Sequence, residues 1–95
     1  MRNVQEGRVA VEYPQEGELV NSREYAIRVD APGAEKVLVA INNGPWKECR
    51  RADNRWWFDW TGFGTGVHEI EAKALLQGGG ALISRTRRIQ ADLVN

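Results

Sequence analysis

The sequence predicts an all-β fold, an antiparallel β-sandwich of two sheets with seven to eight strands. Three observations lead to it: apolar and polar residues alternate with period two, turn signals recur about every ten residues, and no stretch has a convincing helical periodicity. The lone cysteine, Cys49, excludes an internal disulfide. With 95 residues, we expect one domain over 1–95, of which 1–7 form a disordered or linker-like lead.

The first half of the chain contains four expected strands. Alternation over 9–13 ends at Pro14, which cannot donate a ladder hydrogen bond. Residues 19–20 re-enter the sheet briefly, and 25–29 alternate as a half-buried strand. The fourth strand covers 37–41, with Val37, Val39 and Ile41 pointing inward.

The second half begins with a hairpin at 42–45, where Asn-Asn-Gly-Pro supplies positions of positive φ. A short polar strand over 46–50 then reads as a sheet edge. Alternation predicts strands over 56–60 and 68–76. The last strand, 81–91, keeps one inward face only if a bulge near Arg87–Arg88 shifts its register.

The alternation of side chains along the strand 56–60 assigns its tryptophans to different faces of the sheet. Trp56, Phe58 and Trp60 share one face of their strand, and Trp57 lies on the other. Three large aromatic side chains on one face favour that face as the buried one, so Trp57 is expected to point outward. The expected core is Val11, Ile27, Val29, Val37, Val39, Ile41, Trp56, Phe58, Trp60, Ile70 and Ala72.

His68 is the single histidine, and Cys49 the single cysteine. His68 could be a general base, but no nucleophile with supporting spacing accompanies it. Its position two residues before Ile70 matches the tyrosine of a tyrosine corner, so we expect a structural role. Cys49 is expected to be a passive thiol on an edge strand, although neighbouring arginines could make it reactive.

The residues resemble a known family. Val-x-Val-x-Tyr-Pro-x-x-Gly at 9–17, the Trp-Phe-Asp-Trp strand and Gly-x-His-x-Ile-x-Ala-x-Ala at 66–74 are similar to bacterial Ig-like domains. This likeness, to the Ig-like or E-set β-sandwich, covers nearly the whole chain. It implies an Ig-like fold and a module repeated in surface, secreted or multi-domain enzyme chains.

Two weaker resemblances imply other roles. The Asn-Gly-Pro-Trp turn at 43–46 looks like the C-terminal Ig-like dimerisation domain of sulfite-oxidase-type enzymes, which implies a homodimer. Ala31-Pro32-x-Ala34-x-x-Val37 followed by Trp46 is similar to the N-terminal starch- and glycogen-binding modules of amylolytic enzymes, which implies glucan binding.

The candidate binding residues are Trp46, Trp57, Arg50 and Arg55. An exposed indole can stack on a sugar or anchor a protein contact, and the arginines can stack on it or clamp an acidic partner. The alternative is that Trp46 folds back over the sheet edge and that the first or last strand partly covers Trp57.

Other classes of function have little support. Thirteen basic and thirteen acidic side chains cancel, so we expect no nucleic-acid partner. No apolar run is long enough for membrane insertion. One cysteine and one histidine cannot build a zinc site, and we expect no metal, no cofactor and no catalytic residue.

The sequence therefore predicts a non-catalytic accessory or interaction module of a larger bacterial protein or assembly. Its expected partner is another protein or a neighbouring domain of its own chain. A carbohydrate-binding module and the homodimerisation domain of an enzyme remain the alternatives. The compartment stays open: extracytoplasmic for a module excised from a longer chain, cytoplasmic for a complete one.

Overall fold

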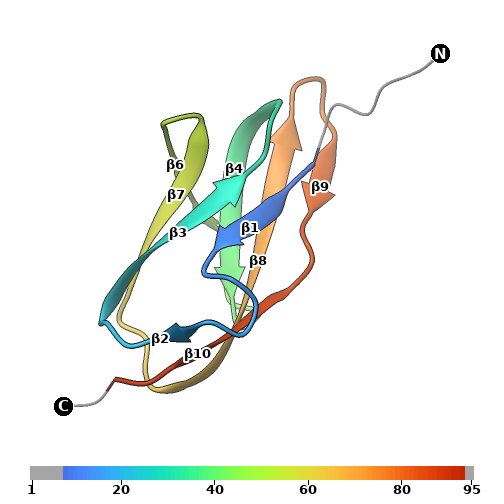
Figure 1. Ribbon diagram of the computed structural model, residues 1–95. Coiled ribbons are helices and arrows are strands. Elements are labelled where there is room, and N and C mark those ends of the chain that lie inside the picture. Colours follow the sequence, from blue (N-terminus) through green and yellow to red (C-terminus); the bar gives the residue numbers. More distant parts are fainter. Residues whose placement is uncertain (1–7, 94–95) are drawn as a thin grey trace.

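The computed structural model describes residues 8–93, which form ten strands in two sheets packed face to face (Figure 1). The predicted all-β sandwich is therefore confirmed, and its single cysteine leaves it without a disulfide. The expected lead at 1–7 lies outside the described residues. Sheet A has the order β1 (Ala10–Tyr13), β3 (Glu24–Asp30), β7 (Arg55–Thr61) and β6 (Arg50–Ala52). Sheet B has the order β2 (Leu19–Val20), β10 (Arg87–Ala91), β8 (Gly66–Leu76), β4 (Ala34–Ile41) and β5 (Lys47–Glu48), and β9 (Ala81–Ile83) also pairs with β8.

Adjacent strands run antiparallel except at one edge, where β2 pairs with β10 in parallel. The longest ladder joins β4 to β8, and the next joins β3 to β7. These two central ladders face each other across the core. The outer strands are shorter, so the edges of both sheets offer only brief runs of free backbone.

Every residue expected in the core belongs to the hydrophobic cluster between the sheets, with Ile41 and Phe58 only partly buried. Ile27, Val29, Val37 and Ile70 have no exposed surface. The cluster also takes in residues that the alternation did not single out, namely Val20, Ala31, Ala34, Cys49, Ala74 and Ile89. Each large apolar side chain buried in this way contributes about 1.5–3 kcal/mol before chain entropy is subtracted.

The expected strand over 46–50 is in fact two strands in different sheets. Lys47–Glu48 pairs with β4 in sheet B, whereas Arg50–Ala52 pairs with β7 in sheet A. Between them the backbone N–H of Cys49 donates to the carbonyl of Val37 at 2.8 Å. The chain changes sheets at Cys49, because its buried side chain turns into the core while the strands on either side remain at the edges.

The last expected strand is also interrupted, and the predicted position of its bulge was wrong. Ile83 pairs with Lys73 and Arg87 with Ile70, so one extra residue lies between them, at 84–86 rather than at Arg87–Arg88. The buried hydroxyl of Ser84 fixes this irregularity. It accepts the backbone N–H of Ala72 and donates to the carbonyl of Arg85, both at 2.9 Å.

Two tight turns use asparagine and aspartate in the left-handed region. Asn42 and Asn43 have φ of 55° and 60° in the expected hairpin, and Asp53 and Asn54 have 55° and 58° between β6 and β7. These residue types tolerate positive φ, and a turn of this hand matches the twist of the flanking strands.

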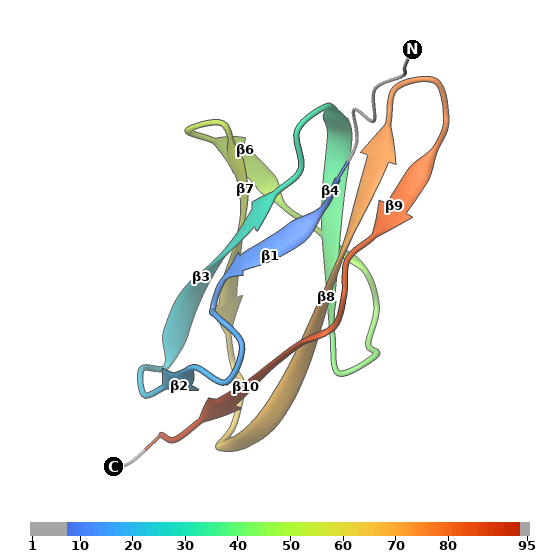
Figure 2. The same ribbon diagram turned by 45° about the vertical axis from the view of Figure 1, so that its right-hand side comes forward.

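The two long sides of the sandwich differ. On one side the chain itself passes from β5 to β6, and we call this the closed side. On the opposite side the edge of sheet A is β1, and sheet B ends in β9 and, beyond β10, in the short strand β2 (Figure 2). The passage from β1 to β2 bridges this side only beside β10, where Gly17 N–H donates to Arg88 O at 2.8 Å. We call it the open side.

Candidate functional site

Trp57 lies on the outer face of sheet A, half-buried, between arginines of both neighbouring strands. Its direct cross-strand partners are Arg28 on β3 and Arg50 on β6. The indole Nε1 donates to the carbonyl of Ala52 at 2.9 Å, which fixes the ring against the β6–β7 turn. The result is a pre-oriented aromatic side chain whose polar atom is already satisfied.

Arg50 is held by a two-pronged bond to Asp59, with Nε and Nη2 each 3.1 Å from a carboxylate oxygen. The hydrogen bond and the charge of Arg50 lower the pKa of Asp59, and those of Asp59 raise the pKa of Arg50. Both groups are exposed, so the pair orients the guanidinium rather than adding much stability.

Arg55 lies on the same face and belongs to a second ionic group. Its Nε is 2.8 Å from Glu12 Oε1 and 3.6 Å from Asp30 Oδ1. Arg28 shares the same oxygen of Glu12 at 2.8 Å, and Arg8 reaches Asp30 at 2.8 Å. The hydrogen bond to Glu12, followed by its charge, raises the pKa of Arg55. The Arg50–Asp59 pair and the group of Arg8, Arg28 and Arg55 with Glu12 and Asp30 are thus two ionic groups on the face that carries Trp57, and we call this face the Trp57 surface.

Trp46 does not belong to the Trp57 surface. It is half-buried beside Lys73, whose Nζ lies 4.6 Å from the centre of the indole. Lys73 points away from the core on β8, because its neighbours Ala72 and Ala74 are fully buried. Trp46 therefore lies on the outer face of sheet B, and the structure brings together only three of the four predicted binding residues, Trp57, Arg50 and Arg55.

The other aromatic side chains of this region face the core. Trp56 and Trp60 are 8% and 4% exposed, and Phe58 packs against the cluster from its rim. Trp60 stacks on Phe63 with ring centroids 3.8 Å apart. Arg51 lies over the Trp56 ring at 5.6 Å. These rings are supports of the sandwich and offer little area to a partner.

His68 ties three segments together at one end of the sandwich. Asn42 Oδ1 accepts the backbone N–H of Glu69 at 2.9 Å, so the amide group of Asn42 presents its Nδ2 to His68 Nδ1 at 3.0 Å. His68 Nε2 then donates to the carbonyl of Gly64 at 2.7 Å. A donor faces Nδ1 and an acceptor faces Nε2, which selects the neutral Nε2–H tautomer. The ring bonds backbone as a corner residue does, and both its nitrogens are engaged.

Cys49 and Tyr25 are shielded from ionisation. Burial, with a smaller contribution from the charge of Glu48, raises the pKa of the Cys49 thiol to about 12. Burial also raises the pKa of Tyr25, whose hydroxyl donates to Glu18 Oε2 at 2.9 Å. A thiol with so high a pKa contains almost no thiolate at neutral pH, which makes it a poor nucleophile.

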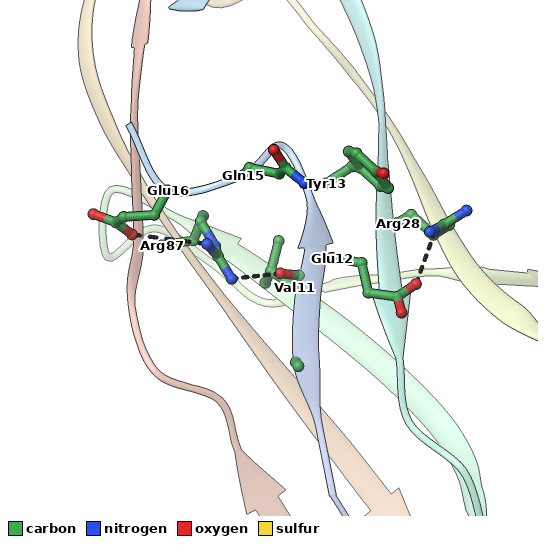
Figure 3. A pocket seen from close by; sticks show the side chains of 8 residues that line it. Val11, Glu12, Tyr13, Gln15, Glu16, Arg28 and Arg87 are labelled. Carbon is green, nitrogen blue, oxygen red and sulfur yellow. Dashed lines mark hydrogen bonds and ion pairs between the residues drawn. The ribbon is translucent and has the colours of Figure 1, made fainter. Parts of the chain in front are cut away.

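A groove on the open side, where Arg87 lies between the sheets, was not predicted from the sequence. Its Nη2 donates to the carbonyl of Val11 at 2.7 Å, and its Nη1 is 4.0 Å from Glu16 (Figure 3). The signal that could have identified Arg87 is its inward phase: it is two residues before the buried Ile89.

In the part of the chain that the structure describes, no group of three or more His, Cys, Asp or Glu side chains could hold a metal ion. Within residues 8–93 we also find no helix whose length and apolarity suit it to crossing a membrane.

No family model matches the sequence, and no curated protein matches it. Solved structures do. The fibronectin(III)-like modules of Clostridium thermocellum CbhA match with a TM-score of 0.71 and 17% identity, over 93% of this chain and 99% of that one. A modular endo-β-1,4-mannanase from Cellulomonas fimi matches with a TM-score of 0.70 and 21% identity, over 90% of this chain and 18% of that one. An engineered protein matches with a TM-score of 0.74 and 22% identity, over 92% and 20%.

These likenesses place the fold among the Ig-like and fibronectin III-type sandwiches. This chain spans about a fifth of two of the three matched chains and nearly the whole of the third. At such identities the likeness concerns the fold alone.

Proposed function

We propose that the chain is a non-catalytic accessory module that makes protein contacts within a larger protein or assembly, through the Trp57 surface. One observation carries the proposal: a fixed, half-exposed indole lies in register between Arg28 and Arg50. Trp and Arg are the residue types that dominate binding energy at protein interfaces, above all when they are held in place before binding.

The folds of the neighbours support a modular role. One is a set of fibronectin(III)-like modules and another is a modular mannanase, in which the matched region is a small part of the chain. The finer assignment to the bacterial Ig-like domains is part of our proposal. It rests on the Tyr-Pro-x-x-Gly strand end at 13–17 and the alternating strand at 66–74.

The surface suits a folded protein partner better than a flexible ligand. Arg50 and Arg55 are already oriented by carboxylates, so little side-chain entropy is lost when a partner docks. The mixture of both charge signs around an aromatic centre matches the polar rim and aromatic core of protein interfaces.

Hydroxyl-radical footprinting tests the proposal, because it reports the oxidation of each tryptophan separately. The isolated chain is compared with the same chain inside its full-length gene product or native assembly. We expect Trp57 to be protected several-fold in the larger context, with Trp46 as the internal control that changes little. Equal oxidation of Trp57 in both samples would contradict a contact at this surface.

Substitution then measures the contact. Against the partner segment found by footprinting, Trp57→Ala should weaken binding roughly 30-fold, as expected for the loss of about 2 kcal/mol at an interface centre. Trp46→Ala should have a much smaller effect.

Carbohydrate binding is the alternative that the same variants detect. Soluble polysaccharides should leave the tryptophan fluorescence unchanged if the proposal holds. A shift on titration that Trp46→Ala or Trp57→Ala abolishes would replace it by glycan binding. Lys73 already occupies one face of the Trp46 ring, which leaves less of that indole for a sugar.

A further inference from the structure

The open side contains a groove along the free edge of β1. Two adjoining depressions of about 600 and 250 Å³ share Ala10, Val11 and Arg87, and Figure 3 shows the larger one. The larger continues past Tyr13 and Glu16, and the smaller runs from Val9 to Ser84 and Arg85. The groove therefore follows β1 over its whole length.

The backbone of β1 is free to bond a further strand. Its only strand partner among the described residues is β3. The carbonyl of Val11 points away from β3, because it accepts Arg87 Nη2 from the other sheet. In an antiparallel ladder the N–H and C=O of a residue point the same way, so the N–H of Val11 also faces the groove. Arg87 supplies the hydrogen bond that the N–H of a neighbouring strand would otherwise make.

The charges in the groove are uneven. The smaller depression is lined by Arg85 and Arg87 and by no carboxylate. The side chain of Arg85 is exposed and makes no hydrogen bond or ion pair with any described residue. Arg87 has one carboxylate contact, at the long distance of 4.0 Å from Glu16. In the larger depression, by contrast, Arg28 is bonded to Glu12 at 2.8 Å.

We propose that the open side binds an extended segment of a partner protein, which adds to β1 as a strand and places an acidic side chain between Arg85 and Arg87. A backbone N–H of the segment replaces the guanidinium on the carbonyl of Val11. Arg87 is thereby released and binds the carboxylate together with Arg85. Main-chain bonds supply affinity in such strand addition, and a side-chain pocket supplies specificity.

The neighbours of the groove fit a strand with alternating side chains. Tyr13, 39% exposed, lies at one end and can cover an apolar side chain of the segment. Arg28 stacks over the Tyr13 ring at 4.6 Å and steadies it. The acidic side chain occupies the opposite end, beside Arg85. This arrangement fixes both the register and the direction of the segment.

Titration with short capped peptides, followed by backbone amide shifts in ¹⁵N-labelled protein, tests the proposal. The peptides alternate valine and threonine and differ only at a central glutamate, glutamine or lysine. We expect shifts concentrated at 9–13 and 84–87, and about tenfold tighter binding of the glutamate peptide than of the glutamine peptide, because charge-assisted bonds to arginine are the stronger kind. The lysine peptide should bind weakest.

Matched variants give the control. Arg85→Gln changes an exposed side chain that has no partner within residues 8–93 and should remove most of the preference for glutamate, as should Arg87→Gln. Arg51→Gln, on the edge strand at the far side of sheet A, should leave it intact. Trp57→Ala should also leave it intact, so that failure here is distinguished from failure of the Trp57 surface.

Several results would overturn the proposal. These are an absence of shifts with all three peptides at millimolar concentration, equal affinity for the glutamate and lysine peptides, or shifts confined to another face. Shifts at 84–87 with inorganic phosphate alone, without any peptide binding, would indicate a simple anion site. A concentration-dependent dimer by light scattering, with shifts at 9–13, would indicate a second copy as the occupant of β1.

Discussion

The two long sides of the sandwich join the sheets by different means. On the closed side the backbone itself passes from sheet B to sheet A, and Cys49 is turned inward with 5% of its surface exposed. On the open side the backbone crosses only beyond β1, in the passage to β2 beside β10, and along β1 itself the side chain of Arg87 reaches from β10 to the carbonyl of Val11. A covalent crossing excludes water and leaves the site of crossing inert. A side chain can rotate away, so the backbone edge that it covers remains available to a partner. The predictions below test this difference, from the largest expected effect to the smallest.

The closed side should not tolerate a charge. Cys49→Asp places a carboxylate where the thiol is buried among apolar groups, and we expect it to cost about 3 kcal/mol or more of the unfolding free energy. Urea denaturation measures the loss. Cys49→Ala is the control for the missing sulfur and should cost about 1 kcal/mol. Near-equal midpoints for the aspartate and alanine variants would show that the closed side admits water.

High pH should weaken the closed side in a graded way. The pKa of the Cys49 thiol in the folded protein is about 12, above its ordinary value of 9.0. Because the folded state resists ionisation, the stability from the neutral thiol is complete below pH 9 and is lost as the pH rises toward 12. Between pH 9.5 and pH 10.5, a change of roughly one unit, the unfolding free energy of the protein with Cys49 should fall by about 1.4 kcal/mol more than that of the Cys49→Ala variant.

Urea unfolding at a series of pH values measures this difference. Tyr25 also has a raised pKa and adds a loss of its own from about pH 10 upward, so Tyr25→Phe serves as the background for both proteins. If the unfolding free energies of the cysteine protein and the alanine variant changed in parallel with pH, burial would not be protecting the thiol from ionisation. Alkylation of Cys49 should correspondingly be slow in the folded protein.

Where the strands lie could be predicted well from the sequence, but which sheet they join could not. Alternation located the strands because each sheet has one buried face, so the pattern repeats every two residues. Period two says nothing about which sheet a strand belongs to. For this reason 46–50 looked like one strand although it contains a change of sheet. For the same reason Trp46 and Trp57 looked like neighbours although they lie on opposite outer faces.

The bulge shows the same limit on a smaller scale. The change of phase between Leu82 and Ile89 indicated one extra residue, and the structure has one. Its position could not be read, because 84–88 is Ser-Arg-Thr-Arg-Arg and contains no apolar residue to mark the inward face. The groove depends on that position, since the extra residue turns Arg87 inward. The candidate site on the open side was therefore hidden by the polar character of its own residues.

The bulge that orients Arg87 should depend on the hydroxyl of Ser84. Ser84→Ala leaves the buried N–H of Ala72 without its acceptor, and we expect a cost of about 1–3 kcal/mol. Ser84→Thr keeps the hydroxyl and is the matched control. Hydrogen exchange measured amide by amide should show faster exchange at Ala72 in the alanine variant than in the threonine variant. Equal exchange rates would show that water replaces the hydroxyl there.

The open side itself should be the least sensitive to substitution. Arg87→Met removes the bond to Val11 and the long contact with Glu16, but the carbonyl of Val11 borders an exposed groove and can bond water instead. The cost should therefore be below about 1 kcal/mol. Urea unfolding measures it, with Arg51→Met as the matched control on the other edge of sheet A. If Arg87→Met lowered the unfolding free energy as much as Cys49→Asp does, the contacts of Arg87 would stabilise the open side as strongly as the backbone crossing stabilises the closed side. A small loss would instead show an edge that the folded protein keeps ready for a strand.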